Sequence, residues 1–196
     1  PLTPINARMP FDHIAIDLAQ FPTSVRGYNY LLVVVDICTR YVVLKPLQTK
    51  TSKETAKQLF AVFCDYGFPK ILQSDNGREF ANSLMESLTN YMRFEQRFTT
   101  PYHPRGNGSV EGKVRAVKSV IKKMLEGQFD QWDSFVSTTQ LAINYKPNPM
   151  IKTAPFTAMF GRNLNLLKNY EEVESKPLSP EELKAHIEHM NTMIYP

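Results

Sequence analysis

Apolar residues in the N-terminal part of the chain recur with the spacing of β-strands. Residues 13–18 alternate between apolar and polar, and Asp17 lies on the face opposite the isoleucines, near the expected strand end. Residues 30–36 form a continuous valine-rich run, which is typical of a strand covered on both faces. A tight connection leads to a third run at 41–46. We therefore predict an antiparallel meander of three strands.

Helical and extended patterns alternate through the middle of the chain. Thr51 and Glu54 form a capping box, and the helix that they begin ends before Gly67 and Pro69. A short strand at 70–74 runs into Asp75. The further predicted elements are a helix at 80–92, a strand at 94–99, a long helix at 109–126 and a helix at 130–145. This order predicts an α/β domain with a mixed sheet.

Each predicted helix has an apolar stripe that should face the core. The stripe of the first helix comprises Ala56, Leu59, Phe60 and Phe63. The later stripes comprise Leu84, Leu88 and Tyr91 or Met92, then Val110, Val114, Val117 and Ile121, then Trp132, Phe135, Val136 and Ile143. Residues 147–162 are interrupted by prolines, so no long helix is predicted there.

The chain divides into three parts by composition. Residues 1–10 are proline-rich and aperiodic and are predicted to be a linker or arm. Residues 11–165 form the core domain, and residues 166–196 form a C-terminal linker and helix, whose start carries a cap at Ser179. Because the chain begins with Pro1 and has no signal peptide, we expect an excised or processed fragment.

Charge and cysteine content exclude few classes of protein. The net charge of +4 and a pI near 9.0 favour polyanionic partners mildly, and a slightly basic soluble domain fits equally well. The longest apolar run, residues 31–35, is too short to cross a membrane, so no membrane association is expected. Cys38 and Cys64 form no C-x-x-C motif, and we expect buried, reduced thiols and an intracellular protein.

Three carboxylates carry the candidate chemistry. Taken singly, Asp17 fits a solvated strand end, Asp75 fits the Asp-Asn-Gly turn that it opens, and Glu111 fits the first turn of a helix. Taken together, two strand-end aspartates and a helix-start glutamate suit two divalent cations, because Mg²⁺ prefers a few carboxylates together with water and phosphate oxygens. Two such ions about 4 Å apart can hold the attacking and leaving oxygens of an in-line displacement.

Basic and aromatic residues follow the same stretch. Arg115 and Lys118 lie one and two helical turns after Glu111, where they can bind DNA phosphates, although an ordinary solvated basic face gives the same pattern. Tyr102 and His103 lie in the loop before Glu111 and can contact unpaired nucleotides. The four histidines form no zinc set with the two cysteines.

The order and spacing of these motifs resemble the catalytic core of a retroviral or Gypsy-type LTR-retrotransposon integrase. The resemblance rests on Asp17 in the first strand, on the SDNGREF motif at 74–80, and on the HPRGNGSVE motif that ends at Glu111 after thirty-five intervening residues. It continues through residues 142–145 and 154–162 and covers roughly residues 8–165. Asp36 recurs in the pattern but is not one of the three family carboxylates.

The resemblance implies an RNase H-like fold with a mixed five-stranded sheet flanked by helices. It implies that Asp17, Asp75 and Glu111 are the catalytic metal ligands and hold two Mg²⁺ or Mn²⁺ ions when DNA is bound. The positions that match DNA contacts of the family are Arg78, Tyr102, Asn107, Arg115 and Lys118.

The resemblance also implies a function. A DDE polynucleotidyl transferase of this family trims the 3′ ends of retroelement DNA and joins them to target DNA. The implied partners are double-stranded DNA and further copies of the chain, as a homodimer or higher oligomer. The implied location is the nucleus, with a virus-like particle at an earlier stage.

Two departures from the family leave alternatives open. Gly112 stands where Gypsy-type relatives often have arginine, and the zinc module and C-terminal DNA-binding module of the family are not evident. The chain is then either a core fragment with reduced activity alone or a domesticated, catalytically silent DNA-binding or protein-interaction module. A simple nuclease of the same fold is a third possibility.

Overall fold

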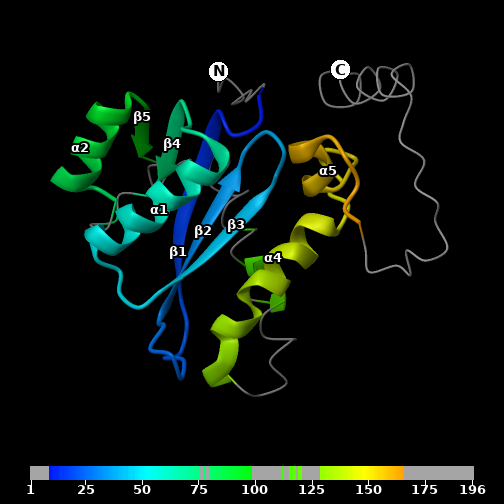
Figure 1. Ribbon diagram of the computed structural model, residues 1–196, viewed down its shortest axis with the longest axis horizontal. Helices are drawn as coiled ribbons and strands as arrows, with labels where there is room; N and C mark the ends of the chain where they lie inside the picture. The colour runs from blue at the N-terminus through cyan, green and yellow to red at the C-terminus, as the bar shows by residue number, and fades with distance from the viewer. Residues whose placement is uncertain are drawn as a thin grey trace.

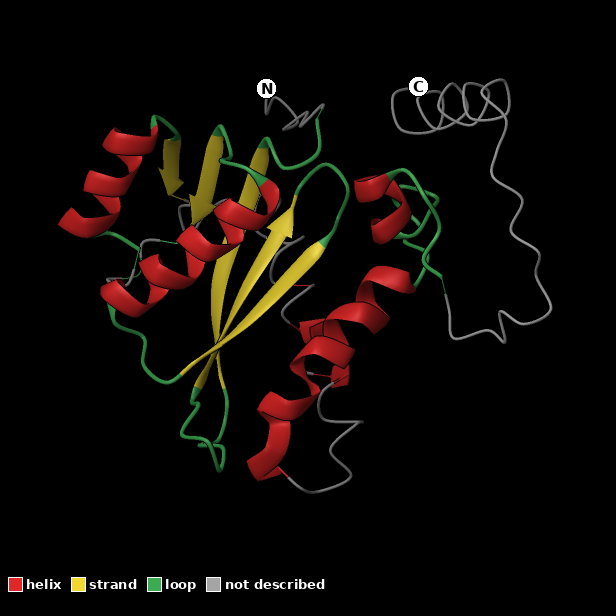
Figure 2. Cartoon of the chain, viewed as in Figure 1, coloured by secondary structure: helices red, strands yellow, loops and turns green. Residues whose placement is uncertain are grey.

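A twisted five-stranded sheet with helices around it forms the fold (Figure 2). The computed structural model describes residues 9–75, 77, 80–98, 112, 115–117, 119–120 and 129–165. Most of the predicted N-terminal arm and the whole C-terminal segment after residue 165 lie outside the described residues.

The sheet has the predicted antiparallel meander at one side and two parallel strands at the other. Strands β1 (His13–Gln20), β2 (Tyr30–Asp36) and β3 (Val42–Leu47) pair antiparallel in chain order. Strand β4 (Ile71–Ser74) runs parallel to β1, and β5 (Glu95–Phe98) runs parallel to β4. The resulting order, β3-β2-β1-β4-β5, confirms the mixed sheet. Asp17 was predicted to lie near the end of its strand. Because β1 extends to Gln20, Asp17 instead lies within the strand.

Helices cover both faces of this sheet. Helices α1 (Ser52–Tyr66) and α2 (Ser83–Met92) pack on the face that carries Ile14 and Ile16, and α1 crosses in front of the strands in Figure 1. The 3₁₀ segment η1 (Phe129–Phe135) and helix α4 (Val136–Tyr145) pack on the face that carries Ala15 and Ala19. A short helix, α5 (Pro155–Phe160), follows α4.

Local chemistry sets the helix boundaries. The predicted capping box of α1 is confirmed in one half only: the Thr51 hydroxyl accepts from the Glu54 amide, but the Glu54 carboxylate accepts from the amides of residues 48 and 49. The predicted start of the second helix at residue 80 is wrong, since Asn82 is the N-cap and its side chain accepts from the amides of residues 84 and 85. Phe80 is instead buried in the core. The helix predicted at 130–145 is divided into the 3₁₀ segment η1, which has a kink at Gln131, and the α-helix α4.

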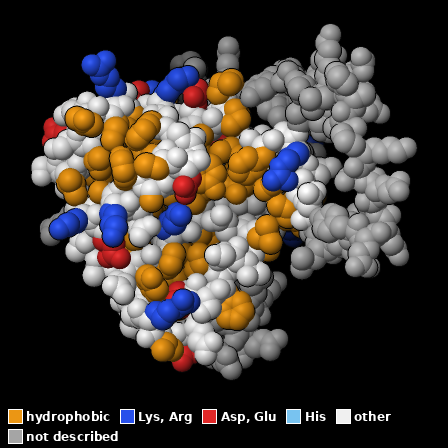
Figure 3. Space-filling model, viewed as in Figure 1, with side chains coloured by type: hydrophobic (Ala, Val, Ile, Leu, Met, Phe, Trp, Pro, Cys, Tyr) orange, Lys and Arg blue, Asp and Glu red, His pale blue; other side chains and the backbone are white. Residues whose placement is uncertain are grey.

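Several side chains predicted to be buried are exposed. Phe60 of α1 is 43% exposed, and Val62 takes a core position. Of the two alternatives at the end of α2, Tyr91 is 84% exposed and Met92 packs against the core. Leu84 is also exposed, and Figure 3 shows apolar side chains gathered over α1 and α2. Both cysteines are free, as expected, but Cys64 is exposed and Cys38 is only partly buried, so their predicted burial is wrong.

Side chains of α4 close one edge of the sheet. The Val42 amide donates to Asn144 Oδ1 at 2.8 Å, and Asn144 Nδ2 donates to the Val42 carbonyl at 2.7 Å. The Leu44 amide donates to Gln140 Oε1 at 2.8 Å. Pro46, two residues further along β3, has no amide hydrogen and cannot donate to another strand. Strand β3 therefore presents a blocked edge, which protects against pairing with another chain.

Replacing Asn144 by leucine should open this edge. The variant leaves the Val42 amide and carbonyl without their side-chain partner, so we expect the free energy of unfolding to fall by about 1–3 kcal/mol. Urea unfolding followed by circular dichroism measures this loss, and light scattering should report association at high concentration. The exposed Ser137→Ala change on the same helix is the control, and equal stability of the two variants would contradict the assignment.

Candidate functional site

Asp17 is a carboxylate set among apolar neighbours. It lies within β1, directly opposite Val33 of β2, on the sheet face that packs against η1 and α4. Its side chain is partly buried, and one carboxylate oxygen accepts from the Leu18 amide at 2.8 Å. A charged group in such a position costs free energy unless a cation or polar partner compensates it.

Asp75 follows the last residue of β4 and is exposed. Its Oδ1 accepts from the Gly77 amide at 3.0 Å, and its carbonyl accepts from the Ser74 hydroxyl at 2.9 Å. The predicted turn is therefore present, but it leaves the carboxylate at the surface. The turn interpretation and the metal-ligand interpretation are compatible, because a turn hydrogen bond uses only some of the oxygen lone pairs.

The sheet register runs toward these two carboxylates. In the parallel β1–β4 pair, His13 lies opposite Ile71 and Ala15 opposite Gln73, and Asp75 directly follows β4. If this register continued for two residues, Asp75 would lie beside Asp17, on strands about 4.8 Å apart. Asp17 shares a face of β1 with His13 and Ala15, and alternation past the end of β4 would direct Asp75 to the same face. Two adjacent hard oxygen ligands of this kind fit a shared Mg²⁺ or Mn²⁺ ion.

The helix predicted to carry the third carboxylate is described only in part. Gly112, residues 115–117 and residues 119–120 are helical. Val117 is fully buried in the cluster on the Asp17 face, which places this helix over the face of the sheet that carries Asp17, and Arg115 is exposed. The predicted site residues Glu111, Arg78, Tyr102, Asn107 and Lys118 lie outside the described residues. Within the described ranges, no group of three or more possible metal ligands occurs.

Asp36 belongs to a turn and not to this site. Its buried carboxylate accepts hydrogen bonds from the Thr39 amide and hydroxyl and from the Cys38 amide. Burial is the largest influence and raises the pKa of the Asp36 carboxyl, while these hydrogen bonds oppose the rise. Burial, followed by the charge of Asp36, raises the pKa of the Cys38 thiol to about 11. The carboxylate therefore stabilises the β2–β3 connection.

Two buried polar residues near the carboxylates were not identified from the sequence. His13 is 2% exposed and Gln73 is 3% exposed, and His13 Nε2 lies 3.1 Å from Gln73 Oε1. Burial is the largest influence on His13 and lowers its pKa. The signal that could have revealed them is spacing, since His13 is four residues before Asp17 and Gln73 is two before Asp75, which puts all four on one face.

The described residues show no membrane-spanning segment. No helix in the described part of the chain is both long and apolar enough to cross a bilayer.

The family model and the similar curated proteins point to the same protein family. The model of the family described as "Integrase core domain" matches residues 7–104. The Pro-Pol polyprotein of feline foamy virus is 34% identical over 170 residues, which cover 85% of this chain and 14% of the polyprotein. The chain spans only 12% to 17% of the three foamy virus polyproteins that it matches.

Solved structures share the fold at lower sequence identity. A chain of the simian T-cell lymphotropic virus intasome, solved in complex with the PP2A regulatory subunit B56 gamma, has a TM-score of 0.71 and 18% identity, covering 87% of this chain and 62% of that one. The HTLV-2 integrase catalytic core in complex with magnesium, in a trimeric form, has a TM-score of 0.63 and 17% identity, covering 76% and 96%. These likenesses confirm the RNase H-like fold class.

Proposed function

This chain belongs to the integrase core domain family of retroviruses and LTR retrotransposons, and on that premise we propose that it is a metal-dependent polynucleotidyl transferase. It would process the 3′ ends of retroelement DNA and join them to target DNA. The observation that carries the proposal is the parallel pairing of β1, which contains Asp17, with β4, which Asp75 directly follows. A transferase site needs such a pair of hard oxygen ligands at an accessible edge.

The proposed cofactor is Mg²⁺ or Mn²⁺, with two ions when DNA is bound. Asp17 and Asp75 fit divalent ions by donor type, and Glu111 is proposed as the third ligand. The HTLV-2 integrase catalytic core, solved in complex with magnesium, supports the use of a divalent ion. When bound, such ions make a water or a 3′-hydroxyl more acidic and neutralise charge on the phosphate.

The chain's own residues hold and orient these groups. Asp17 is held on β1 opposite the buried Val33, so its carboxylate has little freedom to move. Asp75 is held by the turn bond to Gly77 and remains accessible to a large substrate. We propose that the exposed Arg115 contacts a DNA phosphate beside the site. Arg78, Tyr102, Asn107 and Lys118 are proposed as further DNA contacts.

A joining assay with labelled DNA tests the proposal. A short duplex that mimics a retroelement end, labelled at one 5′ end, is incubated with the chain and Mn²⁺ or Mg²⁺, and the products are sized. Products longer than the substrate, dependent on the metal, support a transferase. Shortened products alone indicate a nuclease of the same fold. Absence of both, together with no metal binding by calorimetry, would indicate the catalytically silent module.

Partners and location are proposed on the same premise. We propose double-stranded DNA and other copies of this chain as partners, with a homodimer or a higher oligomer as the working form. The trimeric HTLV-2 core and the simian T-cell lymphotropic virus intasome support assembly. The proposed location is the nucleus. Light scattering of the purified chain, with and without DNA, tests the proposed assembly.

A further inference from the structure

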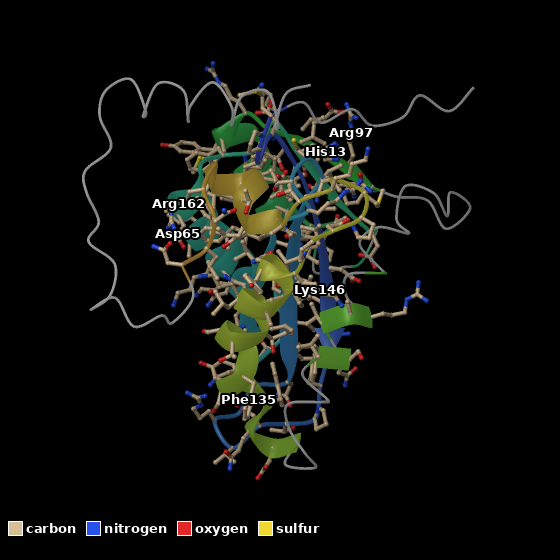
Figure 4. The ribbon with its side chains drawn as sticks, turned by 90° about the vertical axis from the view of Figure 1, so that its right-hand side faces the viewer. His13, Asp65, Arg97, Phe135, Lys146 and Arg162 are labelled. Atoms are coloured by element: carbon tan, nitrogen blue, oxygen red, sulfur yellow. The ribbon has the colours of Figure 1, made fainter. Side chains whose placement is uncertain are left out.

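A buried polar pair links the two strands that carry the proposed metal ligands. His13 Nε2 of β1 lies 3.1 Å from Gln73 Oε1 of β4, and both side chains are almost completely buried. Polar groups in such a position lose hydration and are tolerated when they bond each other. Figure 4 labels His13 of β1 and Arg97 of β5, which lie on the two strands that flank β4, and the charge of Arg97 acts on the His13 ring.

The register shows what this hydrogen bond connects. Gln73 lies opposite Ala15, whose side chain is a single methyl group, and the imidazole of His13 reaches diagonally past it. On β1, His13 and Asp17 share a face, and on β4, Gln73 lies on the same face two residues before Asp75, which follows the strand end. The bond therefore ties β1 to β4 beside the position where the two carboxylates meet.

We propose that His13 and Gln73 are positioning residues whose hydrogen bond fixes β4 against β1 and so sets the separation of the Asp17 and Asp75 carboxylates. This inference rests on the proposed function. Residues that orient metal ligands through hydrogen bonds typically change metal affinity by about 10–100-fold when they are removed. Neither side chain is proposed to touch metal or DNA.

The arrangement favours a neutral imidazole. His13 Nδ1 is buried and has no hydrogen-bond partner among the described residues. The charged groups that act on the ring are Arg97 and Glu95 of β5 and Asp36 of β2. Burial outweighs the hydrogen bond to Gln73 and the two carboxylates, with Arg97 acting in the same direction as burial, and the pKa of His13 is lowered. Protonation would place an unpaired N–H in the interior.

The sign of the pH effect follows from this lowered pKa. In the unfolded chain, histidine binds a proton below about pH 6.5, while the folded chain resists protonation. The stability supplied by neutral His13 is therefore complete above that pH and is lost as the pH falls from about 6.5 toward the lower folded value. The hold of β1 on β4 should weaken over the same window.

Two substitutions of His13 by unbranched side chains of similar length distinguish a role of its hydrogen bond from a role of its packing. His13→Gln keeps a donor near the position of Nε2, whereas His13→Met has a similar volume and no donor. The first readout is amide hydrogen exchange of residues 72–75, which needs neither metal nor DNA. The second is Mn²⁺ affinity, measured from the free Mn²⁺ signal in electron paramagnetic resonance. Gln73→Met, which removes the other partner, is the second variant should His13→Met fail to fold.

The expected results are specific for the hydrogen bond. His13→Met and Gln73→Met should speed exchange at residues 72–75 about tenfold and weaken Mn²⁺ binding about tenfold, while His13→Gln stays within about threefold of the original chain. The original chain should keep its Mn²⁺ affinity at pH 6.5 and lose it only at lower pH, where folded His13 becomes protonated, and His13→Gln should not show that step.

The outcomes also separate this inference from the proposed function. If folded His13→Met or Gln73→Met exchanges at residues 72–75 as slowly as the original chain, the positioning role is wrong. If exchange responds as expected but the original chain binds no Mn²⁺, the hydrogen bond positions the strands and the proposed metal-dependent function is the part that fails. If His13→Gln behaves like His13→Met, packing and not the donor is responsible, which also overturns the inference.

Discussion

Replacing either Asp17 or Asp75 by asparagine is expected to abolish DNA joining almost completely. Asparagine keeps the shape of the side chain but removes the charge that a divalent ion requires. Loss of a single group that stabilises developing charge at an active site typically lowers the rate by about a hundred- to a thousand-fold, and a shared metal ligand should lie at or beyond the upper end. The rate of product formation in the joining assay, with the metal in excess, measures the loss.

Although Asp17→Asn should lose DNA joining, its folding stability should stay the same or rise slightly. Without a metal, the two carboxylates repel each other, so Asp17→Asn should leave the free energy of unfolding unchanged or slightly higher. A catalytic loss without a loss of stability separates a ligand from a structural residue. Asp65→Asn, an exposed carboxylate change on α1, is the control and should join DNA at the original rate. Normal joining by folded Asp17→Asn would refute the metal assignment.

The part of this site that could be predicted from the sequence is the part that local patterns determine. Alternation along β1 separates Asp17 from the isoleucines, and the turn residues after β4 place Asp75 at a strand end. Side-chain period and turn chemistry are properties of a few consecutive residues, so a single sequence contains them. The parallel pairing of β1 with β4 is a long-range property, and only the structure shows it.

The errors arose where tertiary packing decides between equivalent faces. Phe60 and Phe63 of α1 both fit an apolar stripe, but the sheet covers Phe63 and leaves Phe60 partly in solvent. Tyr91 fits the spacing of α2, yet α2 turns Met85 toward the core. Helical spacing defines a stripe only to within one residue on either side, because neighbouring positions on the helix surface are similarly placed. The position of the sheet then selects which edge of the stripe is buried.

The edge of the sheet gives a further example of long-range information. Asn144 and Gln140 look like ordinary polar residues of a helix, and nothing in their neighbourhood along the chain indicates buried bonds. Their partners, Val42 and Leu44, are about a hundred residues away. The same holds for His13 and Gln73, which are sixty residues apart. Polar residues that act across the fold are therefore the class that pattern analysis misses most readily.

Replacing Trp132 by alanine is expected to have the largest effect on stability. Trp132 is completely buried, stacks on Phe21 with ring centroids 4.6 Å apart, and donates from Nε1 to the Pro22 carbonyl at 2.7 Å. It lies in the same cluster as Val117, whose helix covers the catalytic face. Removing a buried tryptophan typically costs about 3–5 kcal/mol, because packing is lost and a cavity remains. Such a loss is a large part of the roughly 5–15 kcal/mol available to a domain.

Two controls show which part of this side chain matters. Trp132→Phe keeps most of the ring packing but leaves the Pro22 carbonyl without its donor, so we expect a loss of about 1–3 kcal/mol. Leu141→Ala removes a half-exposed apolar side chain from α4 and should cost less than about 1 kcal/mol. Urea unfolding must be followed by far-ultraviolet circular dichroism, because Trp132 is the only tryptophan and its fluorescence disappears with it. If Trp132→Ala costs no more than Leu141→Ala, the aromatic cluster does not hold η1 against the β1–β2 connection.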